Sequence, residues 1–243
     1  MRPLLIVKAG DTLPDVAARR GDFDRWIGEA LALSSLPVET VNVHRDEALP
    51  PPESVAGVVV TGSPAMVSHR EPWSERTAAW LAEAFAAQTW ILGICYGHQL
   101  LAHGLGGRVG PNPRGRQIGT VDVELDAQGD RLLGDLPRNV RVQASHSEVV
   151  LEFPDGAIPL GRCPMDPHHA CRLGDRVWGV QFHPEFDADI MRGYIAGRSS
   201  LIAEEGGDPA ALAAACQDSP HGAALLGRFG QLVEDAEARR SAS

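Results

Sequence analysis

Positive charge and long apolar runs are both scarce in this sequence. Its 243 residues include 22 Lys and Arg against 32 Asp and Glu, which gives a formal net charge of −10. Nucleic acids and anionic membranes attract proteins through a cationic field, so this balance argues against both as partners. No apolar run approaches the about 20 residues that a membrane-spanning helix requires. We therefore expect neither a nucleic-acid nor a membrane partner.

Cysteine is sparse as well. The chain has four cysteines, at positions 95, 163, 171 and 216. They form no Cys-x-x-Cys pair, and their number does not indicate a disulfide scaffold. The apolar run at residues 4–7 is shorter than the about 7–15 residues of a signal-peptide core, and Lys8 interrupts it. These features predict a cytoplasmic protein.

What the first half of the chain does have is an alternation of strand-like and helix-like segments. Apolar or alternating runs predict strands at 4–8, 38–43, 56–60, 89–94 and 176–182. Apolar residues at helical spacing predict helices at 23–33, 74–87 and 97–105. This pattern predicts a single α/β domain whose central, mostly parallel sheet is flanked by helices.

The second half of the chain has a different pattern. Alternating runs at 120–125, 140–144 and 149–153 predict antiparallel strands, which we expect to be a smaller addition to the α/β core. The tail from Asp187 is helical in composition, with an interruption at 206–209. We therefore divide the chain into a domain at 1–200 and a C-terminal helical extension at 201–243 that packs on it.

Residues 93–97, Gly-Ile-Cys-Tyr-Gly, combine a strand end, a cysteine and a helix start. They have the Gly-x-Ser-x-Gly pattern of a nucleophile elbow, with Cys95 in place of serine. Such a turn leaves no room for side chains two residues before and after the nucleophile, which accounts for Gly93 and Gly97. The helix that begins at the sulfur favours the thiolate through its N–H groups and dipole. A buried structural cysteine is the alternative interpretation.

A histidine and a carboxylate lie two residues apart near the end of the last predicted strand. In an extended segment His183 and Glu185 point to the same side. The carboxylate can then fix the tautomer of the imidazole and stabilise its cation, which leaves the other ring nitrogen for a thiol. A single histidine at a strand end is more often structural. The spacing of His183 and Glu185 therefore indicates a catalytic role only in combination with the cysteine elbow.

Together these segments resemble the class I glutamine amidotransferases, the Cys-His-Glu family that includes the glutaminase domain of GMP synthase. Three landmarks match in order, at residues 61–64 (Thr-Gly-Ser-Pro), 93–99 (Gly-Ile-Cys-Tyr-Gly-His-Gln) and 179–185 (Gly-Val-Gln-Phe-His-Pro-Glu). Residues 145–148 are similar to a fourth landmark, Ser-His-x-Asp, with Glu148 where Asp is usual. The resemblance covers about residues 4–200 and implies a flavodoxin-like α/β fold for the amidotransferase domain at 1–200.

The resemblance also implies a mechanism and a site. Cys95 would attack the side-chain amide of glutamine, His183 would transfer the proton, and Glu185 would orient His183, with a γ-glutamyl thioester formed and ammonia released. The backbone N–H groups of Ser63 and Tyr96 would form the oxyanion hole. The implied substrate contacts are Gly62, Gln99, Ser145, His146 and Ser147.

Motifs for ATP chemistry are absent. The sequence contains neither a Ser-Gly-Gly-x-Asp-Ser loop of the ATP pyrophosphatase type nor a Walker A motif, and we expect no cofactor. The glutaminase would either pass ammonia to a separate ATP-dependent synthetase subunit or act alone on γ-glutamyl compounds. A free-standing γ-glutamyl peptidase or hydrolase is thus one alternative. A non-catalytic regulatory relative is the other, although the intact cysteine, histidine and glutamate count against it.

Two further groups of residues invite a functional interpretation. One group consists of Cys163, His168, His169 and Cys171. Their spacing fits no usual zinc pattern, and Pro164 and Pro167 indicate a loop, so we expect no metal site. The other group, at residues 114–116 (Arg-Gly-Arg), is a small basic spot that either faces an anionic group or is ordinary surface.

Overall fold

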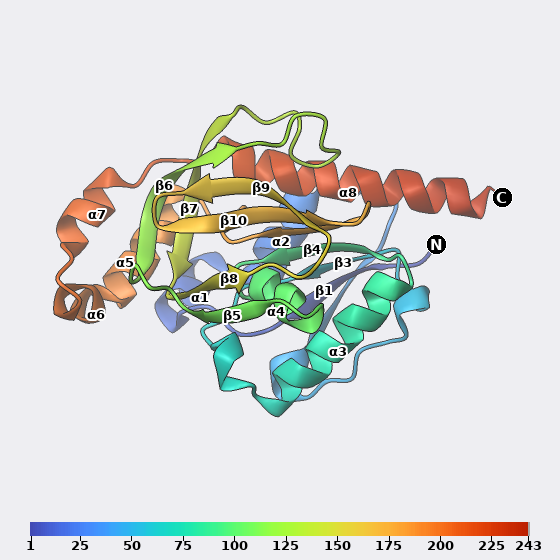
Figure 1. Ribbon diagram of the computed structural model, residues 1–243, viewed down its shortest axis with the longest axis horizontal. Helices are drawn as coiled ribbons and strands as arrows, with labels where there is room; N and C mark the ends of the chain where they lie inside the picture. The colour runs from blue at the N-terminus through green and yellow to red at the C-terminus, as the bar shows by residue number, and fades with distance from the viewer. Residues whose placement is uncertain (243) are drawn as a thin grey trace.

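A nine-stranded sheet runs through the middle of the structure, a computed structural model that describes residues 1–242 (Figure 1). Half of this sheet is parallel, in the order β2, β1, β3, β4, β11. The parallel strands are β1 (Leu4–Lys8), β2 (Val38–Asn42), β3 (Gly57–Val60), β4 (Trp90–Ile94) and β11 (Val177–Val180). Counted among themselves they have the order 2-1-3-4-5 of flavodoxin-like sheets. The prediction of an α/β domain around a parallel sheet is confirmed.

The other half of the sheet is antiparallel. Its strands follow β11 in the order β10 (Asp166–Leu173), β9 (Ala157–Cys163), β6 (Gln117–Leu125) and β7 (Asn139–His146). A separate antiparallel pair, β5 (Arg108–Pro111) and β8 (Glu148–Glu152), contacts α4 (Tyr96–Gly104). The predicted antiparallel addition is therefore present, and most of it extends the main sheet.

The loop predicted around Pro164 and Pro167 is wrong. Residues 157–173 form the β9–β10 hairpin, which turns at Pro164 and Met165. The pairing slips between Asp166 and Ala170, and Pro167 lies within this irregular stretch, where a missing backbone donor does not interrupt the ladder. Prolines that would break a regular central strand are thus accommodated.

Helices cover both faces of the parallel half of the sheet. The helices are α1 (Pro14–Arg20), α2 (Phe23–Leu31), α3 (Pro72–Ala86), α4, α5 (Ala188–Gly197) and α8 (Pro220–Ser241). Successive strand residues point to opposite faces. Leu4 and Ile6 of β1 therefore pack in a core shared with α2, α5 and α8, whereas Leu5 and Val7 pack with α3 and α4. Each core thus attaches one layer of helices to its own face of the same sheet.

The segment after residue 187 is helical, as predicted. Asp187 caps α5 by accepting a hydrogen bond from the backbone N–H of Ile190 at 2.8 Å. The short helices α6 (Ser199–Glu204) and α7 (Pro209–Ala215) follow. The predicted interruption lies between them, and Asp208 there caps α7. Three single-turn 3-10 helices lie elsewhere, at Val43–Arg45, Pro52–Ser54 and Val67–His69.

The long helix α8 belongs to the same core as the sheet. Phe229 and Leu226 are fully buried among residues of α2 and β4. At its first turn, a Cβ on Gly222 would lie 2.4 Å from the carbonyl oxygen of Pro184, so this helix touches the chain between His183 and Glu185. No helix within residues 1–242 is both long and apolar enough to cross a membrane.

Candidate active site

The residues with predicted chemistry gather at one edge of the sheet. Gly62 and Ser63 follow β3, Cys95 follows β4, and His183 follows β11. Because β3, β4 and β11 are parallel neighbours, their carboxyl ends lie side by side. Ligand sites of open α/β sheets lie at this edge.

The turn at Cys95 has the strained geometry of a nucleophile elbow. Cys95 has φ 51° and ψ −102°, values that an L-residue adopts only when its surroundings impose them. A Cβ on Gly93 would lie 2.5 Å from the carbonyl oxygen of Gly97, and one on Gly97 would lie 2.4 Å from that of Val60. The two glycines are therefore required by contact, and the sulfur stands at the start of α4.

The neighbourhood of the sulfur contains one side chain to which the sequence analysis gave no role. The backbone N–H of Cys95 donates to Val180 at 2.8 Å, which fixes the elbow to β11. The side-chain amide of Gln181 lies 3.6 Å from Sγ, and the carbonyl oxygen of Ser145 lies 3.9 Å from it. Cys95 is only 5% exposed, so these groups largely define what the sulfur meets.

His183 and Glu185 form a buried pair. His183 Nδ1 lies 2.7 Å from Glu185 Oε1, and the His183 backbone N–H donates to Gln143 at 2.8 Å. The ring stacks on Phe186 with centroids 4.1 Å apart, which fixes its plane. Glu185 Oε2 has no hydrogen-bond partner among the described residues, so the carboxylate is committed to the imidazole.

Electrostatics favour a charged imidazole in this position. Burial by itself would lower the pKa of His183, but the negative charges of Glu185 and Cys95 outweigh it and raise the pKa well above its ordinary value. The arrangement therefore favours an imidazolium at position 183.

The loop after β3 lies against the imidazole. A Cβ on Gly62 would lie 2.7 Å from His183 Cε1, so only glycine leaves room for the ring. Ser63 is held by its hydroxyl, which donates to Ala9 at 2.8 Å and accepts from the N–H of Ala65 at 3.1 Å. Tyr96 is the first residue of α4, so its N–H has no acceptor within the helix.

A cavity of about 370 Å³, counting its open mouth, adjoins Cys95. Its walls include Ser63, Tyr96, Gln99, Ser145, His146 and Ser147, which the sequence analysis placed in the site. The Gln99 amide is already engaged, since it donates to the Glu148 carbonyl at 2.7 Å and to Gln181 Oε1 at 3.0 Å. Gln99 therefore positions Gln181 beneath the sulfur as well as lining the cavity.

Three charged residues on this cavity were not given roles from the sequence. Arg116, Glu148 and Arg198 line it together with Cys95. Residues 114–116 and 145–148 were noted as segments, but nothing in the sequence showed which side chains would meet at the cysteine. Arg198 had no signal at all, because it lies in a helical tail about 100 residues beyond Cys95.

The structure groups a different set of potential metal ligands from the one considered in the sequence. Ligand atoms of His146, Asp166 and His169 lie within 4.8 Å of one another, and all three side chains are buried. Only His169 is common to both sets. His168 Nδ1 instead lies 2.7 Å from the carbonyl oxygen of Val150.

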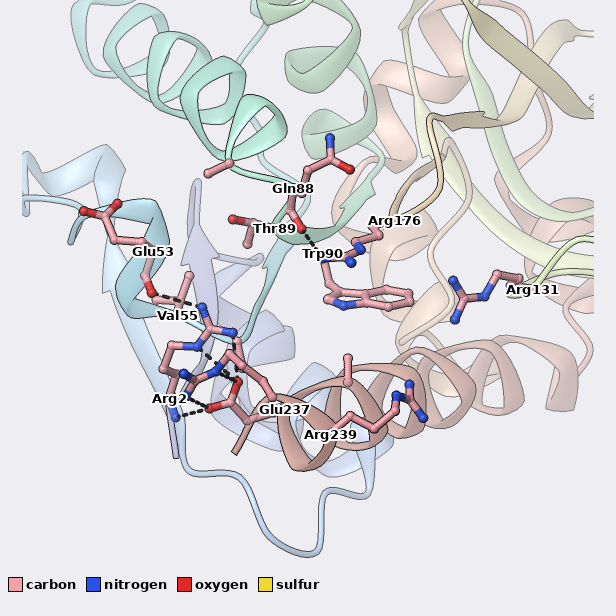
Figure 2. Close-up of a pocket in the computed structure, with 14 residues that line it drawn as sticks. Arg2, Glu53, Val55, Gln88, Thr89, Trp90, Arg131, Arg176, Glu237 and Arg239 are labelled. Carbon is pink, nitrogen blue, oxygen red and sulfur yellow. Dashed lines mark hydrogen bonds and ion pairs between the residues drawn. The ribbon is translucent and has the colours of Figure 1, made fainter. Parts of the chain in front are cut away.

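A second cavity, of about 1040 Å³ counting its open mouth, lies at the opposite edge of the parallel strands (Figure 2). Five arginines are among the residues that line it: Arg2, Arg131, Arg176, Arg239 and Arg240. The Arg131 guanidinium lies 4.9 Å from the centre of the Trp90 ring, and Arg2 is paired with Glu237 at 2.8 Å. This cavity contains none of the predicted site residues, so the chemistry belongs to the carboxyl-end edge.

The fold and the cysteine elbow define a class of α/β proteins with a Cys-His-Glu arrangement, and the comparisons with known proteins identify the family. Residues 21–196 match the glutamine amidotransferase class-I family, and the chain belongs to it. The GMP synthase [glutamine-hydrolyzing] of Aeropyrum pernix is 38% identical over 182 residues, 75% of this chain. That of Thermomicrobium roseum is 39% identical over 132 residues, 54% of this chain.

These relatives are much longer than the chain. The matched regions span 32% of the Aeropyrum protein and 24% of the Thermomicrobium protein. A solved structure of a glutamine amidotransferase from Thermotoga maritima is similar over nearly its whole length. It superposes with a TM-score of 0.70 and 19% identity, covering 97% of this chain and 98% of that one. This last similarity shows the fold.

Proposed function

We propose that the chain hydrolyses the side-chain amide of glutamine through a covalent Cys95 intermediate. The observation that carries this proposal is the coincidence of a strained cysteine elbow with a buried His183–Glu185 pair at 2.7 Å, on adjacent strands. The family of the chain and its glutamine-hydrolysing relatives support the same activity.

The reaction follows from the charges in the site. The Cys95 thiolate attacks the amide carbon, and the C–N bond breaks as the His183 imidazolium gives its proton to the departing ammonia. Water then attacks the thioester while His183 takes one of its protons. Glutamate leaves, and the cysteine is restored. Glu185 keeps the imidazole in place and compensates its charge throughout.

The tetrahedral intermediates need donors for their oxyanion. The N–H of Tyr96 points from the first turn of α4, and the N–H of Ser63 lies on the loop that contacts His183. We assign these two groups to the oxyanion hole. The substrate then lies in the cavity with its amino-acid end toward Gln99 and residues 145–147.

The proposed hydrolysis fits two candidate roles, one with a partner that uses the ammonia and one without a partner. The GMP synthase relatives favour a separate ATP-dependent synthetase as partner. The second candidate is a γ-glutamyl hydrolase that acts alone. A specific observation favours it, because the His183–Glu185 pair is already assembled in the single chain, whereas a partner-dependent glutaminase gains from an unassembled site.

The direct test is the variant Cys95→Ala, assayed for release of ammonia from glutamine. We expect activity to fall to background while the far-ultraviolet circular dichroism stays unchanged. Cys216→Ala is the matched control and should retain activity, since Cys216 lies outside the cavity. A glutamine-like electrophile should label Cys95 and spare the other three cysteines. Equal labelling elsewhere, or full activity without Cys95, would overturn the proposal.

A further inference from the structure

Two arginines lie on the wall of the Cys95 cavity, and they differ in how they are paired. Arg116 is neutralised by Glu205, with Nε 2.9 Å from Oε2 and Nη2 3.2 Å from Oε1. This geometry is the two-pronged pairing typical of guanidinium and carboxylate. Arg116 is therefore already paired within the chain.

Among the residues that the structure describes, Arg198 has no carboxylate partner of this kind. It lies between α5 and α6, and its guanidinium carbon stands 4.9 Å from the centre of the Tyr194 ring. Nη1 is buried and has no hydrogen-bond partner among the described residues. A buried donor without an acceptor destabilises the unbound protein, and a bound acceptor would remove that cost.

The side chain of Arg198 lies on the walls of the cavities that hold the reacting groups. Arg198 lines the cavity that contains Cys95, and it also lines a smaller adjoining cavity that contains His183. Its charge interacts with that of Cys95, and burial lowers the pKa of the guanidinium, which nevertheless stays charged at neutral pH. A permanent cation thus faces the space that the substrate must enter.

The same cavity has a carboxylate on its wall. Glu148 is 4% exposed, and its Oε2 accepts a hydrogen bond from the N–H of Ser68 at 3.3 Å. A cavity with an anionic and a cationic group on its wall suits an amino-acid end, which carries an ammonium and a carboxylate. An uncharged substrate would leave Arg198 unpaired.

We propose that Arg198 binds a carboxylate of the substrate and so selects γ-glutamyl compounds that present one there. This inference rests on the proposed function, because it names the substrate group that enters the same site. The carboxylate comes either from the α-carbon of the γ-glutamyl group or from the amine that leaves. Glutamine supplies only the first, whereas a γ-glutamyl amino acid supplies both.

The test compares binding of two matched pairs of compounds. The pairs are glutamine with its α-amide, and γ-glutamylglycine with γ-glutamylglycinamide. Affinities are measured calorimetrically on the full chain carrying Cys95→Ser, with and without Arg198→Gln. We expect Arg198 to give at least tenfold preference for the carboxylate in one pair and Arg198→Gln to abolish it. If Arg198→Gln abolishes the carboxylate preference within the glutamine pair, Arg198 binds the α-carboxylate. If it abolishes the preference only within the γ-glutamylglycine pair, Arg198 binds the carboxylate of the leaving amine.

Two further variants make the result decisive. Arg198→Lys keeps the charge and should retain part of the preference, whereas Arg25→Gln, at an exposed ion pair on α2, should leave it unchanged. If Arg198→Gln does not fold, Arg198→Lys and the four affinities of the parent chain still decide. An absence of carboxylate preference in both pairs, or a preference that survives Arg198→Gln, overturns the inference.

The outcome is separable from that of the proposed function. Binding is measured without turnover, so a carboxylate preference that depends on Arg198 would stand even if the wild-type chain released neither ammonia nor glycine. Conversely, turnover of these compounds with unchanged constants in Arg198→Gln would leave the hydrolase proposal intact and remove the role of Arg198.

Discussion

The charge state of His183 sets the pH range in which the proposed chemistry can run. Its pKa is raised, so the ring stays protonated through neutral pH and loses its proton only in alkaline solution. The active form needs both the thiolate and the imidazolium. Activity should therefore fall at alkaline pH, where His183 loses its proton.

Glu185→Gln should move the alkaline limb of this profile. Glu185 is the largest of the influences that raise the pKa of His183, so its neutralisation should lower that pKa and shift the limb to lower pH. The measurement is kcat/KM for ammonia release across pH in both proteins. Asp235→Asn, an exposed change on α8, should not move the limb. An unshifted limb in Glu185→Gln would show that the carboxylate does not control the imidazolium.

His183→Ala should be more damaging than Glu185→Gln. Loss of the proton-transfer group should lower the rate by a factor of about 10²–10⁴. The Glu185 carboxylate acts only through the imidazole, so its neutralisation should cost less. Cys95 and His183 work as a unit, so the double variant Cys95→Ala/His183→Ala should be hardly worse than either single variant. Single-turnover and steady-state rates test this, and losses that multiply would disprove the proton relay.

At this scale the sequence patterns singled out the candidate reacting groups but not their surroundings. Cys95, His183 and Glu185 lie in local patterns whose spacing has chemical meaning, and the structure places them on adjacent strands. Gln181 and Arg198 meet the cysteine only because distant segments fold together. Their roles depend on contacts between residues about 90–100 positions apart, which no local pattern records.

Among the elements, the β4–α4 elbow depends most strictly on its glycines. Gly97→Ala would place a Cβ 2.4 Å from the Val60 carbonyl oxygen and should destabilise the fold by about 1–3 kcal/mol. The matched control is Gly28→Ala in α2, where nothing lies within 4 Å of the new Cβ. That change should be neutral or stabilise by up to about 1 kcal/mol. Urea unfolding measures both, and equal effects would contradict the steric argument.

Helices and strands were predicted well where the apolar residues recurred at a single spacing, either helical or strand-like. The parallel strands and helices α2, α3 and α4 lie within a few residues of their predicted ranges. The β9–β10 hairpin was missed because its prolines read as a loop, while its slipped pairing tolerates them. The short helix α1 has only one buried residue, Val16, and thus left too weak an apolar pattern to detect.

Helix α8 should contribute strongly to stability. Phe229 is fully buried between α8 and the sheet, so Phe229→Ala should lower the free energy of unfolding by about 3–5 kcal/mol. Asp235→Ala, on the exposed side of the same helix, should change it by less than about 0.5 kcal/mol. Denaturant titration distinguishes them. The division of the chain at residue 200 stays a prediction, and a small effect of Phe229→Ala would favour a dispensable extension.

For the whole molecule, the question is whether the site works without a partner. If the chain is a free hydrolase, its kcat on the true γ-glutamyl compound should lie in the common range of about 1–10³ s⁻¹ when assayed alone. If it serves a synthetase, an ATP pyrophosphatase partner should raise kcat tens-fold or more. Steady-state kinetics with and without such a partner decide between the two, and the assembled His183–Glu185 pair leads us to expect the first result.

Helix α8 runs from the middle of the molecule to its right-hand end in Figure 1. One end touches Pro184 beside the reacting groups, and the other is joined to Arg2 through Glu237. The 22 residues of the helix span about 33 Å at the usual rise per residue. A bead or fluorophore attached at Ser241 would thus be held away from the mouth of the Cys95 cavity, so the protein could be immobilised through this end of α8 with that mouth facing the liquid.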